Sequence, residues 1–472
     1  MIRTVARKEM LEIIRDGRFR WSAAITLLLL CGALAMGWQH YRDVASQHEA
    51  ARRDTRQQWL KQGEKNPHSA AHYGVYAFKP RMPLSLVDPG VDPYVGVAAW
   101  LEAHKQNEFK FKPAQDATAL QRLGELTGAT VLQLLLPLVI ILLTFSAFAS
   151  ERELGTLRQL MSLGVSRSDL AWGKALGISG ALAMLLLPAT VIGVAGLALT
   201  AENGALAGST PRLLLLFAGY LAYFAVFLGI SLAVSAKASS ARVALITLLG
   251  FWIFNGLLAP KAVTDLARSI HPTPSTLQFA RDIEHDIENG MDGHNPADSR
   301  AEALKQELLR KYNVDSVNKL PIDFNGVRMQ AGEEYGNQVF DRHYGALWAT
   351  YDRQRRIHDL ASILAPSLAI RSLSMGLAGT DFPQHAHFSQ AAEQYRRLIN
   401  REMNMDLAHH AKGKPVYMAK ESLWQKIPDF HYEAPGLGWV VRNHTLSLVL
   451  LTVWCLAAAL AASWMSRRME VI

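Results

Sequence analysis

The chain has 472 residues, half of them apolar, and a formal net charge of +8. Six apolar stretches are each long enough to cross a bilayer, which takes about 20 residues of helix, so a purely soluble protein is excluded. The basic residues lie mostly at the ends of these stretches, where anionic lipid headgroups attract them, and no mixed basic and aromatic patch of the kind that binds nucleic acid occurs. Membrane lipids are therefore expected partners, and nucleic acid is not.

Residues 1–20 predict an amphipathic basic helix with Val5, Ile13 and Phe19 among its apolar anchors, suited to lie along the inner leaflet. A first span is predicted at residues 21–39. Ala33-Leu34-Ala35 resembles a signal-peptide cleavage site, but the apolar run is longer than a typical h-region, which favours a retained span.

The first segment outside the membrane covers residues 40–125. Residues 46–61 predict a polar helix that extends the first span, and a stretch around Pro80, Pro83 and Pro89 is rich in turns. Residues 115–126 predict a helix that leads into a second span at 126–149. Pro137 in this span and Pro188 in the third span, at 175–199, are expected to kink their helices.

A polar hairpin is predicted at residues 150–174, between the second and third spans. Leucines at helical spacing predict a helix over 150–163, and Gly164 can end it with a positive φ. Ser166 is a good N-cap for the next helix, with Asp169 placed for a capping box. The candidate docking residues of this stiff hairpin are Glu151, Arg152, Glu153, Gly155, Thr156, Arg158, Gly164, Ser166, Arg167, Asp169 and Lys174.

The pattern E-x-E-x-G-T-L, followed by L-G-V-S-R and then G-K, resembles the cytoplasmic segment of ABC-2 type permeases. The resemblance implies that the hairpin presses into a cleft of a partner ATPase, that residues 1–20 are the elbow helix of the family, and that permeases pair through spans one and five. A second resemblance lies farther along the chain, to bacterial permeases that carry a domain of unknown function called DUF3526. It rests on residues 364–369, Gly379-Thr380-Asp381, Phe388, Glu393, Tyr395 and Arg396.

Further spans are predicted at 213–235, 243–260 and 439–465, with a tail at 466–472. Lys and Arg gather at the termini and the hairpin, so both termini are expected in the cytoplasm. The resemblance implies that the membrane is the inner membrane of a bacterium. The fold class is thus a mainly α polytopic membrane protein with six spans, whose large, mostly helical periplasmic domain is built from the inserted segments 40–125 and 261–438. Cys31 and Cys455 both fall in spans, so this domain has no disulfides.

Asn255 is the most polar side chain in any predicted span. Either it forms a hydrogen bond between helices or it lines a substrate pathway.

The second inserted segment shows two amphipathic helices, one marked by Phe340, Tyr344 and Tyr351 and the other by Phe388, Ala392 and Ile399. Glu393 and Arg397 can pair at i,i+4 on the second helix. The aromatic faces either pack together as a core or line a passage. Between these helices, the apolar stretch 368–377 is expected either inside the domain or on the outer membrane surface.

No catalytic constellation is evident. Gly173-Lys174-Ala175 lacks the upstream glycine and the hydroxyl of a phosphate loop, and His48-Glu49-Ala50-Ala51-Arg52 lacks the second histidine of a metalloprotease motif. No cofactor is expected in this chain, and ATP and Mg²⁺ are assigned to the partner ATPase. His385, His387, His409 and His410 could bind copper or zinc, or could simply be solvated or hydrogen-bonded histidines.

The sequence therefore predicts the permease subunit of an ATP-driven transporter, with a second permease copy or a sister permease as partner. One alternative is a subunit that transmits ATP-driven motion to a periplasmic partner without passing a substrate. A membrane enzyme would require a cluster of polar residues at one depth of the membrane.

Overall fold

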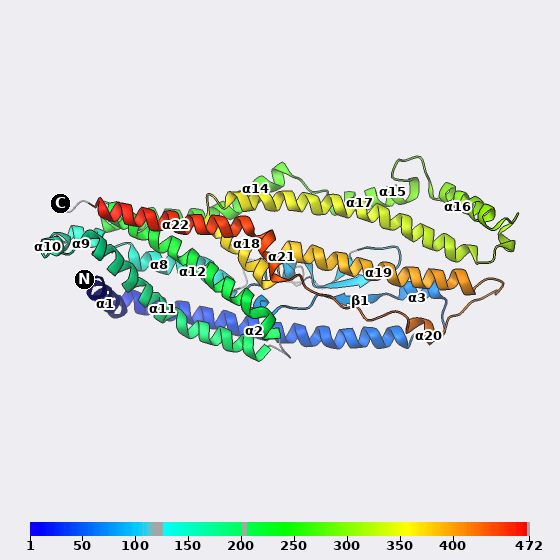
Figure 1. The fold of residues 1–472 in the computed structure, drawn as a ribbon, viewed down its shortest axis with the longest axis horizontal. Helices are drawn as coiled ribbons and strands as arrows, with labels where there is room; N and C mark the ends of the chain where they lie inside the picture. Colours follow the sequence, from blue (N-terminus) through cyan, green and yellow to red (C-terminus); the bar gives the residue numbers. More distant parts are fainter. Residues whose placement is uncertain (107, 111, 113, 115–125, 201–204, 470–472) are drawn as a thin grey trace.

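The computed structural model describes residues 1–106, 108–110, 112, 114, 126–200 and 205–469. The molecule is long and narrow (Figure 1). The N-terminus and the helices α1, α9 and α10 lie at one end, and α16 and α20 lie at the other. The helix predicted at 115–126 falls almost entirely outside the described residues.

Within the described residues, six helical stretches are long and apolar enough to cross a membrane: Gly17–Leu60, Gly128–Glu153, Arg167–Ala198, Ser209–Lys237, Ala241–Ile270 and Thr445–Arg467. The mainly helical, six-span architecture is thereby confirmed. The polar extension of the first span is also present, since α2 (Gly17–Leu60) continues without a break to Leu60. The fourth span belongs to α12 (Ala205–Lys237), which begins before the predicted residue 213, and the fifth continues past 260 to Ile270.

The amphipathic helix α1 (Ile2–Arg15) lies against α11 (Arg167–Thr200), so one of its faces is covered by protein rather than by lipid. Glycines permit the close approach: a Cβ on Gly173 would lie 2.5 Å from the Val5 Cβ, and one on Gly177 would lie 2.7 Å from the Ala6 carbonyl oxygen. Small residues let helix backbones pack tightly in membranes. The expectation of a helix that only rests on the leaflet was therefore incomplete.

Two π-helical segments lie side by side in the second and fifth spans. The first, η2 (Val131–Leu135), precedes α8 (Leu136–Thr144), and the second, η3 (Phe254–Leu258), joins α13 (Ala241–Ile253) to α14 (Ala259–Ile270). Pro137 cannot donate to the Gln133 carbonyl, which instead accepts from the Tyr223 hydroxyl at 3.0 Å. The Trp252 indole donates to the neighbouring Leu134 carbonyl at 2.9 Å. Side chains of other spans thus satisfy backbone groups that lipid could not.

The first inserted segment holds a small antiparallel sheet that the sequence did not reveal. In the described part of the chain, β1 (Val75–Phe78), β2 (Ala98–Leu101) and β3 (Glu108–Lys110) pair in that order, with Val75 opposite Leu101 and Ala99 opposite Phe109. The same segment contains the short helices α3 (Pro67–Tyr73), η1 (Pro83–Leu86) and α4 (Asp92–Val95), and α7 (Gly128–Thr130) leads into the second span. The strands were missed because each is short and lies among prolines and glycines.

The second inserted segment is helical, as predicted. Its elements are α15 (Thr276–Asn289), α16 (Ala297–Tyr312), η4 (Val317–Lys319), α17 (Phe324–Ala361), α18 (Pro366–Ala378), α19 (Phe382–His410), α20 (Glu421–Trp424) and α21 (Leu437–Asn443), followed by the last span in α22 (Thr445–Arg467). The long helices α17 and α19 run side by side (Figure 1). Phe340, Phe388 and Ile399 are buried, so these positions form a core, as one of the two alternatives held.

The apolar helix α18 packs against the spans rather than inside the extramembrane domain, so that alternative for 368–377 was wrong, and its place relative to the membrane surface stays a prediction. It packs among the spans: Ile370, Leu373 and Leu377 share one buried cluster with Leu216 and Tyr220 of α12. Polar contacts hold it there, because Ser374 bonds to the Tyr220 hydroxyl at 3.0 Å and Arg212 donates to the Leu377 carbonyl at 3.4 Å. This helix joins the spans to the domain.

A buried polar junction completes that connection. His444, at the start of α22, contacts the Asp381 carboxylate at 2.7 Å through Nε2 and the Ser372 hydroxyl at 3.1 Å through Nδ1. Asp381 also accepts from the Gln384 amide and so caps α19. Burial raises the pKa of Asp381, but the hydrogen bond and charge of His444 outweigh it, so this pKa lies below its ordinary value. The junction therefore binds α18, α19 and α22 together.

Replacing His444 with Ala should destabilise the protein by about 3 kcal/mol, because the buried Asp381 carboxylate would lose its hydrogen-bonding partner. The measurement is the unfolding midpoint of the detergent-solubilised protein. The control His431→Ala changes an exposed histidine of the same domain and should leave the midpoint unchanged. Equal midpoints for both variants would show that the junction does not stabilise the fold.

Candidate functional site: the polar hairpin and its anchors

The hairpin is two short helices, α9 (Ala149–Glu153) and α10 (Thr156–Ser162), rather than the single helix predicted over 150–163. The break occurs at Gly155, whose φ of 74° is left-handed and favours glycine. Gly164 takes a φ of 79°, as expected of it. The next helix is α11 itself, so the second arm of the hairpin is the beginning of the third span. Ser166 Oγ accepts from the Asp169 amide at 3.0 Å, which confirms the N-cap, while the reciprocal bond of a capping box stays a prediction.

Lys174 is the centre of a buried ion cluster that fixes the base of the hairpin. Its Nζ lies 2.9 Å from a carboxylate oxygen of Glu9 on α1 and 2.9 Å from one of Glu151 on α9. The Lys174 side chain is only 3% exposed, so its charge depends on these two carboxylates. Glu151 and Lys174 therefore act inside the molecule and do not form part of a docking surface.

Arg152 also points inward. Its guanidinium donates to the carbonyls of Ala236 and Ala238, at the carboxyl end of α12. Nearby, the buried Ser235 hydroxyl accepts from the Phe148 amide at 3.0 Å and donates to the Phe145 carbonyl at 2.8 Å, which bridges the bend between α8 and α9. The hairpin is thus attached to the fourth span.

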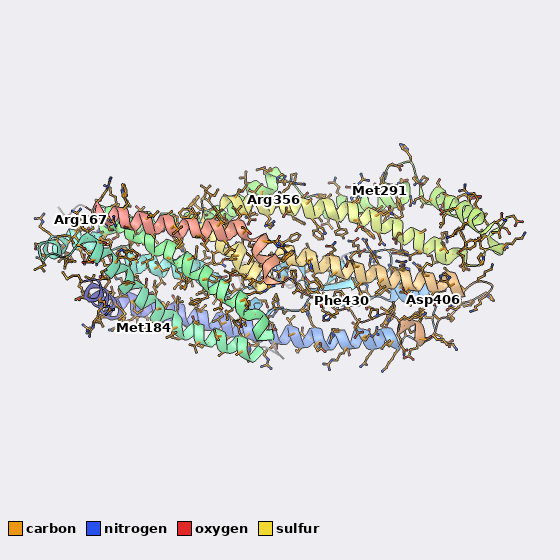
Figure 2. All side chains as sticks on the ribbon, viewed as in Figure 1. Arg167, Met184, Met291, Arg356, Asp406 and Phe430 are labelled. Atoms are coloured by element: carbon orange, nitrogen blue, oxygen red, sulfur yellow. The ribbon has the colours of Figure 1, made fainter. Side chains whose placement is uncertain are left out.

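Two further contacts stiffen the hairpin. The Thr156 hydroxyl donates to the Glu151 carbonyl at 3.2 Å across the Gly155 turn, and Leu157 is fully buried beneath α10. Arg167 donates to the Arg467 carbonyl at 2.7 Å and so joins α11 to the end of α22. Figure 2 shows Arg167 at the end of the molecule opposite to Asp406.

Most of the remaining candidates are exposed and, together with two leucines, form a surface here called the tip surface. It comprises Glu153, Leu154, Gly155, Arg158, Leu163, Gly164, Ser166 and Arg167. Leu154 and Leu163 are 77% and 75% exposed, which is unusual for leucines in so polar a segment. Exposed apolar side chains among charges are typical of protein contact sites. The sequence predicted one helix over 150–163 that includes Leu154, because it did not place the break at Gly155.

Asn255 lies in η3 and is almost fully buried. Its side chain accepts from the Ser367 amide at 3.0 Å and donates to the Tyr223 hydroxyl at 3.3 Å. These bonds join the fifth span to α12 and α18, in agreement with the first reading of this residue as a hydrogen bond between helices. The pathway role has no support from these contacts.

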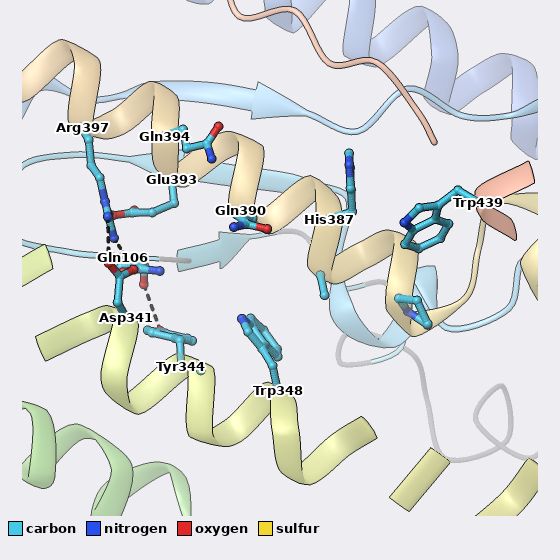
Figure 3. Close-up of a pocket in the computed structure, with 13 residues that line it drawn as sticks. Gln106, Asp341, Tyr344, Trp348, His387, Gln390, Glu393, Gln394, Arg397 and Trp439 are labelled. Atoms are coloured by element: carbon cyan, nitrogen blue, oxygen red, sulfur yellow. Dashed lines mark hydrogen bonds and ion pairs between the residues drawn. The ribbon is translucent and has the colours of Figure 1, made fainter. Parts of the chain in front are cut away.

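The extramembrane domain holds a cavity of about 500 Å³ between α17 and α19. Figure 3 shows Tyr344 and Trp348 on α17 facing Gln390 and His387 on α19, with Trp439 at one end. At the other end Arg397 bonds to Asp341 at 2.6 Å and to Glu393 at 2.7 Å, which confirms the predicted i,i+4 pair. The aromatic face of α17 therefore lines a polar hollow as well as packing a core.

The four histidines singled out as metal candidates are not brought together. His385 and His387 lie at the start of α19, while His409 and His410 lie at its end, about 33 Å away at 1.5 Å per residue. His387 bonds to the Tyr432 hydroxyl at 3.0 Å, and His410 pairs with Asp406 at 3.0 Å. Burial lowers the pKa of His385 to about 3, so this ring is neutral at physiological pH.

Six apolar spans with a braced polar hairpin at one end and a large domain at the other define a multi-pass membrane subunit. Residues 91–254, which include the hairpin, match the family model described as ABC-2 family transporter protein, and residues 276–433 match the domain of unknown function DUF3526. These matches confirm both resemblances and support an ABC-2 type permease with DUF3526.

One curated relative is named "Probable ABC transporter permease protein NosY", from Pseudomonas aeruginosa. It is 34% identical to the chain over 131 residues, which are 26% of this chain and 45% of the relative. The chain therefore matches less than half the length of that relative. The match supports a permease-type membrane subunit of an ABC transporter.

Replacing Lys174 with Met should destabilise the protein by about 3 kcal/mol, because two carboxylates in a protected site would lose their common cation. The matched control is Lys8→Met, since Lys8 is half exposed and lies 3.9 Å from the same Glu151; exposed ion pairs contribute about 0–1 kcal/mol. Unfolding midpoints in detergent measure both. Similar losses for the two variants would contradict the assigned role of Lys174.

Proposed function

We propose that the chain is the transmembrane permease subunit of an ATP-driven exporter in a bacterial inner membrane. Separate cytoplasmic ABC ATPase subunits bind ATP and Mg²⁺, and their closure moves the hairpin. The spans then shift and move a substrate outward across the membrane.

The observation that carries this proposal is the contrast between the tip surface and the anchors beneath it. The tip surface is exposed and combines two leucines with charges of both signs, which suits a cleft of another protein. The anchors are buried ion pairs and hydrogen bonds that reach α1 through Glu9 and α12 through Arg152. Since the hairpin is braced in this way, a force applied at its tip is passed to several helices instead of bending a loop.

The proposed orientation places the hairpin and both termini in the cytoplasm and the extramembrane domain in the periplasm. The hairpin end carries basic residues in short connections, and such residues favour the cytoplasmic side. The domain lies at the other end of the molecule. Its two inserted segments are long, and long segments cross the membrane regardless of their charge.

The proposal includes a second permease, either another copy of this chain or a sister permease. Large apolar side chains face outward on the first and fifth spans, among them Trp21, Leu28 and Ile246, which are 74%, 72% and 65% exposed. In a membrane these faces meet either lipid or another permease. The family resemblance assigns the pairing contact to these two spans.

A second candidate function is the transmission of ATP-driven motion to a periplasmic partner. The buried helix α18 and the junction of His444 with Asp381 favour it, because they connect span movement directly to a large domain. The two functions differ in the interface between paired permeases. A continuous passage there, seen in a structure of the full complex, indicates transport, whereas a closed interface in every nucleotide state indicates transmission.

Leu154→Arg and Glu153→Arg should each weaken the stimulation of the partner's ATPase activity by the permease. The apparent affinity of the permease for the ATPase should fall at least tenfold. Both residues are exposed, so a bulky cation at either position should spoil the docking contact and leave the fold intact. The measurement is ATP hydrolysis by the purified ATPase titrated with permease in lipid nanodiscs. Gly155 is less suitable for this test, since a side chain at its positive φ would strain the turn.

Lys412→Glu, an exposed change in the extramembrane domain, serves as the control and should stimulate like the wild type. Full stimulation by both tip variants would remove the docking role of the hairpin.

A further inference from the structure

Three histidines from two parts of the first inserted segment converge on one point. His68 and His72 lie one turn apart on α3, and His104 lies in the turn that follows β2. The nitrogen atoms that these rings can offer to a metal lie within 4.8 Å of one another. These are not the histidines that the sequence suggested, because their approach depends on how α3 packs against the sheet.

The distance between the first two rings fits a shared metal ion. His68 Nε2 and His72 Nε2 are 3.2 Å apart. Two nitrogen ligands at 2.0–2.1 Å from a tetrahedral zinc ion are separated by about 3.3 Å. Histidines at i and i+4 on one face of a helix are a common ligand pair for this reason.

The third ring is held in place by a buried carboxylate. His104 Nδ1 contacts Glu333 of α17, and the His104 backbone amide donates to the same carboxylate at 3.2 Å. Glu333 is itself fixed by Arg396 at 3.2 Å and Asn400 at 2.9 Å. When the His104 ring is neutral and Nδ1 carries the proton in this contact, Nε2 keeps the lone pair that a metal needs. A carboxylate behind a histidine is a frequent feature of metal sites.

His68 is oriented in the same manner. Its Nδ1 lies 3.2 Å from the Asn404 side-chain oxygen on α19, so its Nε2 is the atom turned toward His72. The backbone at His104 has a φ of 64°, a left-handed conformation that costs energy in a residue with a Cβ. Two of the rings thus have an acceptor at Nδ1, and the backbone of His104 is strained. Histidines that only face solvent would not need this arrangement, which costs free energy.

We propose that His68, His72 and His104 bind one divalent transition-metal ion, Zn²⁺, through three imidazole nitrogens, with a fourth coordination position open to solvent. Imidazole ligands without carboxylates exclude Mg²⁺ and Ca²⁺, which take oxygen ligands. His72 and His104 are exposed, so the ion can enter and leave. A bound ion would link α3 to the turn after β2 and, through Glu333 and Asn404, to α17 and α19. It would therefore clamp the first inserted segment onto the second.

The test uses the full chain, purified in detergent, stripped with a chelator and dialysed against micromolar Zn²⁺. We expect about one equivalent of zinc per chain, and Co²⁺ in its place should give the intense visible absorption of tetrahedral cobalt. His72→Ala should weaken zinc binding at least tenfold. His409→Ala, which removes an exposed histidine at the far end of α19, is the control and should bind as the wild type does.

A stability readout separates lost ligation from lost folding. Without metal, His72→Ala should unfold at the wild-type temperature, since the His72 ring is exposed, while zinc should raise the midpoint of the wild type alone. Equal zinc binding by the wild type and His72→Ala, or no zinc retained by the wild type, would overturn the site. Binding of Cu²⁺ alone, in a square-planar geometry, would overturn the assignment of zinc.

Discussion

The buried Lys174 cation between Glu9 and Glu151 is the interaction on which the hairpin end of this protein depends. Removing a charge from water costs several kcal/mol, and that cost is offset here because two carboxylates from different helices converge on one ammonium group. The cluster fixes α1, the hairpin and the third span in one arrangement. In the proposed function, the tip surface above this cluster transmits a displacement, which an unbraced loop between two spans could not.

At the opposite end of the spans, buried contacts connect the spans to the extramembrane domain. The helix α18 buries its leucines among the spans. Its Ser374 bonds to Tyr220, and its Ser367 bonds to Asn255 in the π-helical segment η3. Such segments disrupt the regular hydrogen bonding of a helix and often occur at functional sites. Both π segments lie where the extramembrane domain meets the membrane helices. In the proposed function, motion that starts at the hairpin reaches the domain through these packed and hydrogen-bonded helices.

The extramembrane domain is stabilised without disulfides. The core between α17 and α19 carries a buried network in which Arg396 pairs with both Glu333 and Glu393. The same Glu333 orients His104 in the proposed metal site. The Glu333 carboxylate thus takes part in both the domain core and the histidine cluster. A bound ion would therefore stabilise a position of His104 that Glu333 already fixes.

The sequence by itself determined the local features. Apolar length predicted the six spans, because a bilayer fixes how many residues a helix needs to cross it. Gly164 and Ser166 marked the end of one helix and the start of the next, since capping depends on a few neighbouring residues. The motif of the hairpin and the 276–433 region also sufficed to indicate the family.

Only the tertiary structure decided which polar residues face inward. Lys174 and Arg152 stood in the same hairpin list as Glu153, yet they are anchors whose partners lie far away in the chain, with Glu9 165 residues from Lys174. The histidine cluster depends on Asn404, 336 residues from His68. Short strands and the place of α18 among the spans likewise follow from long-range packing. Periodicity and capping report on neighbours within a few residues, so contacts of this kind leave no local signal in the sequence.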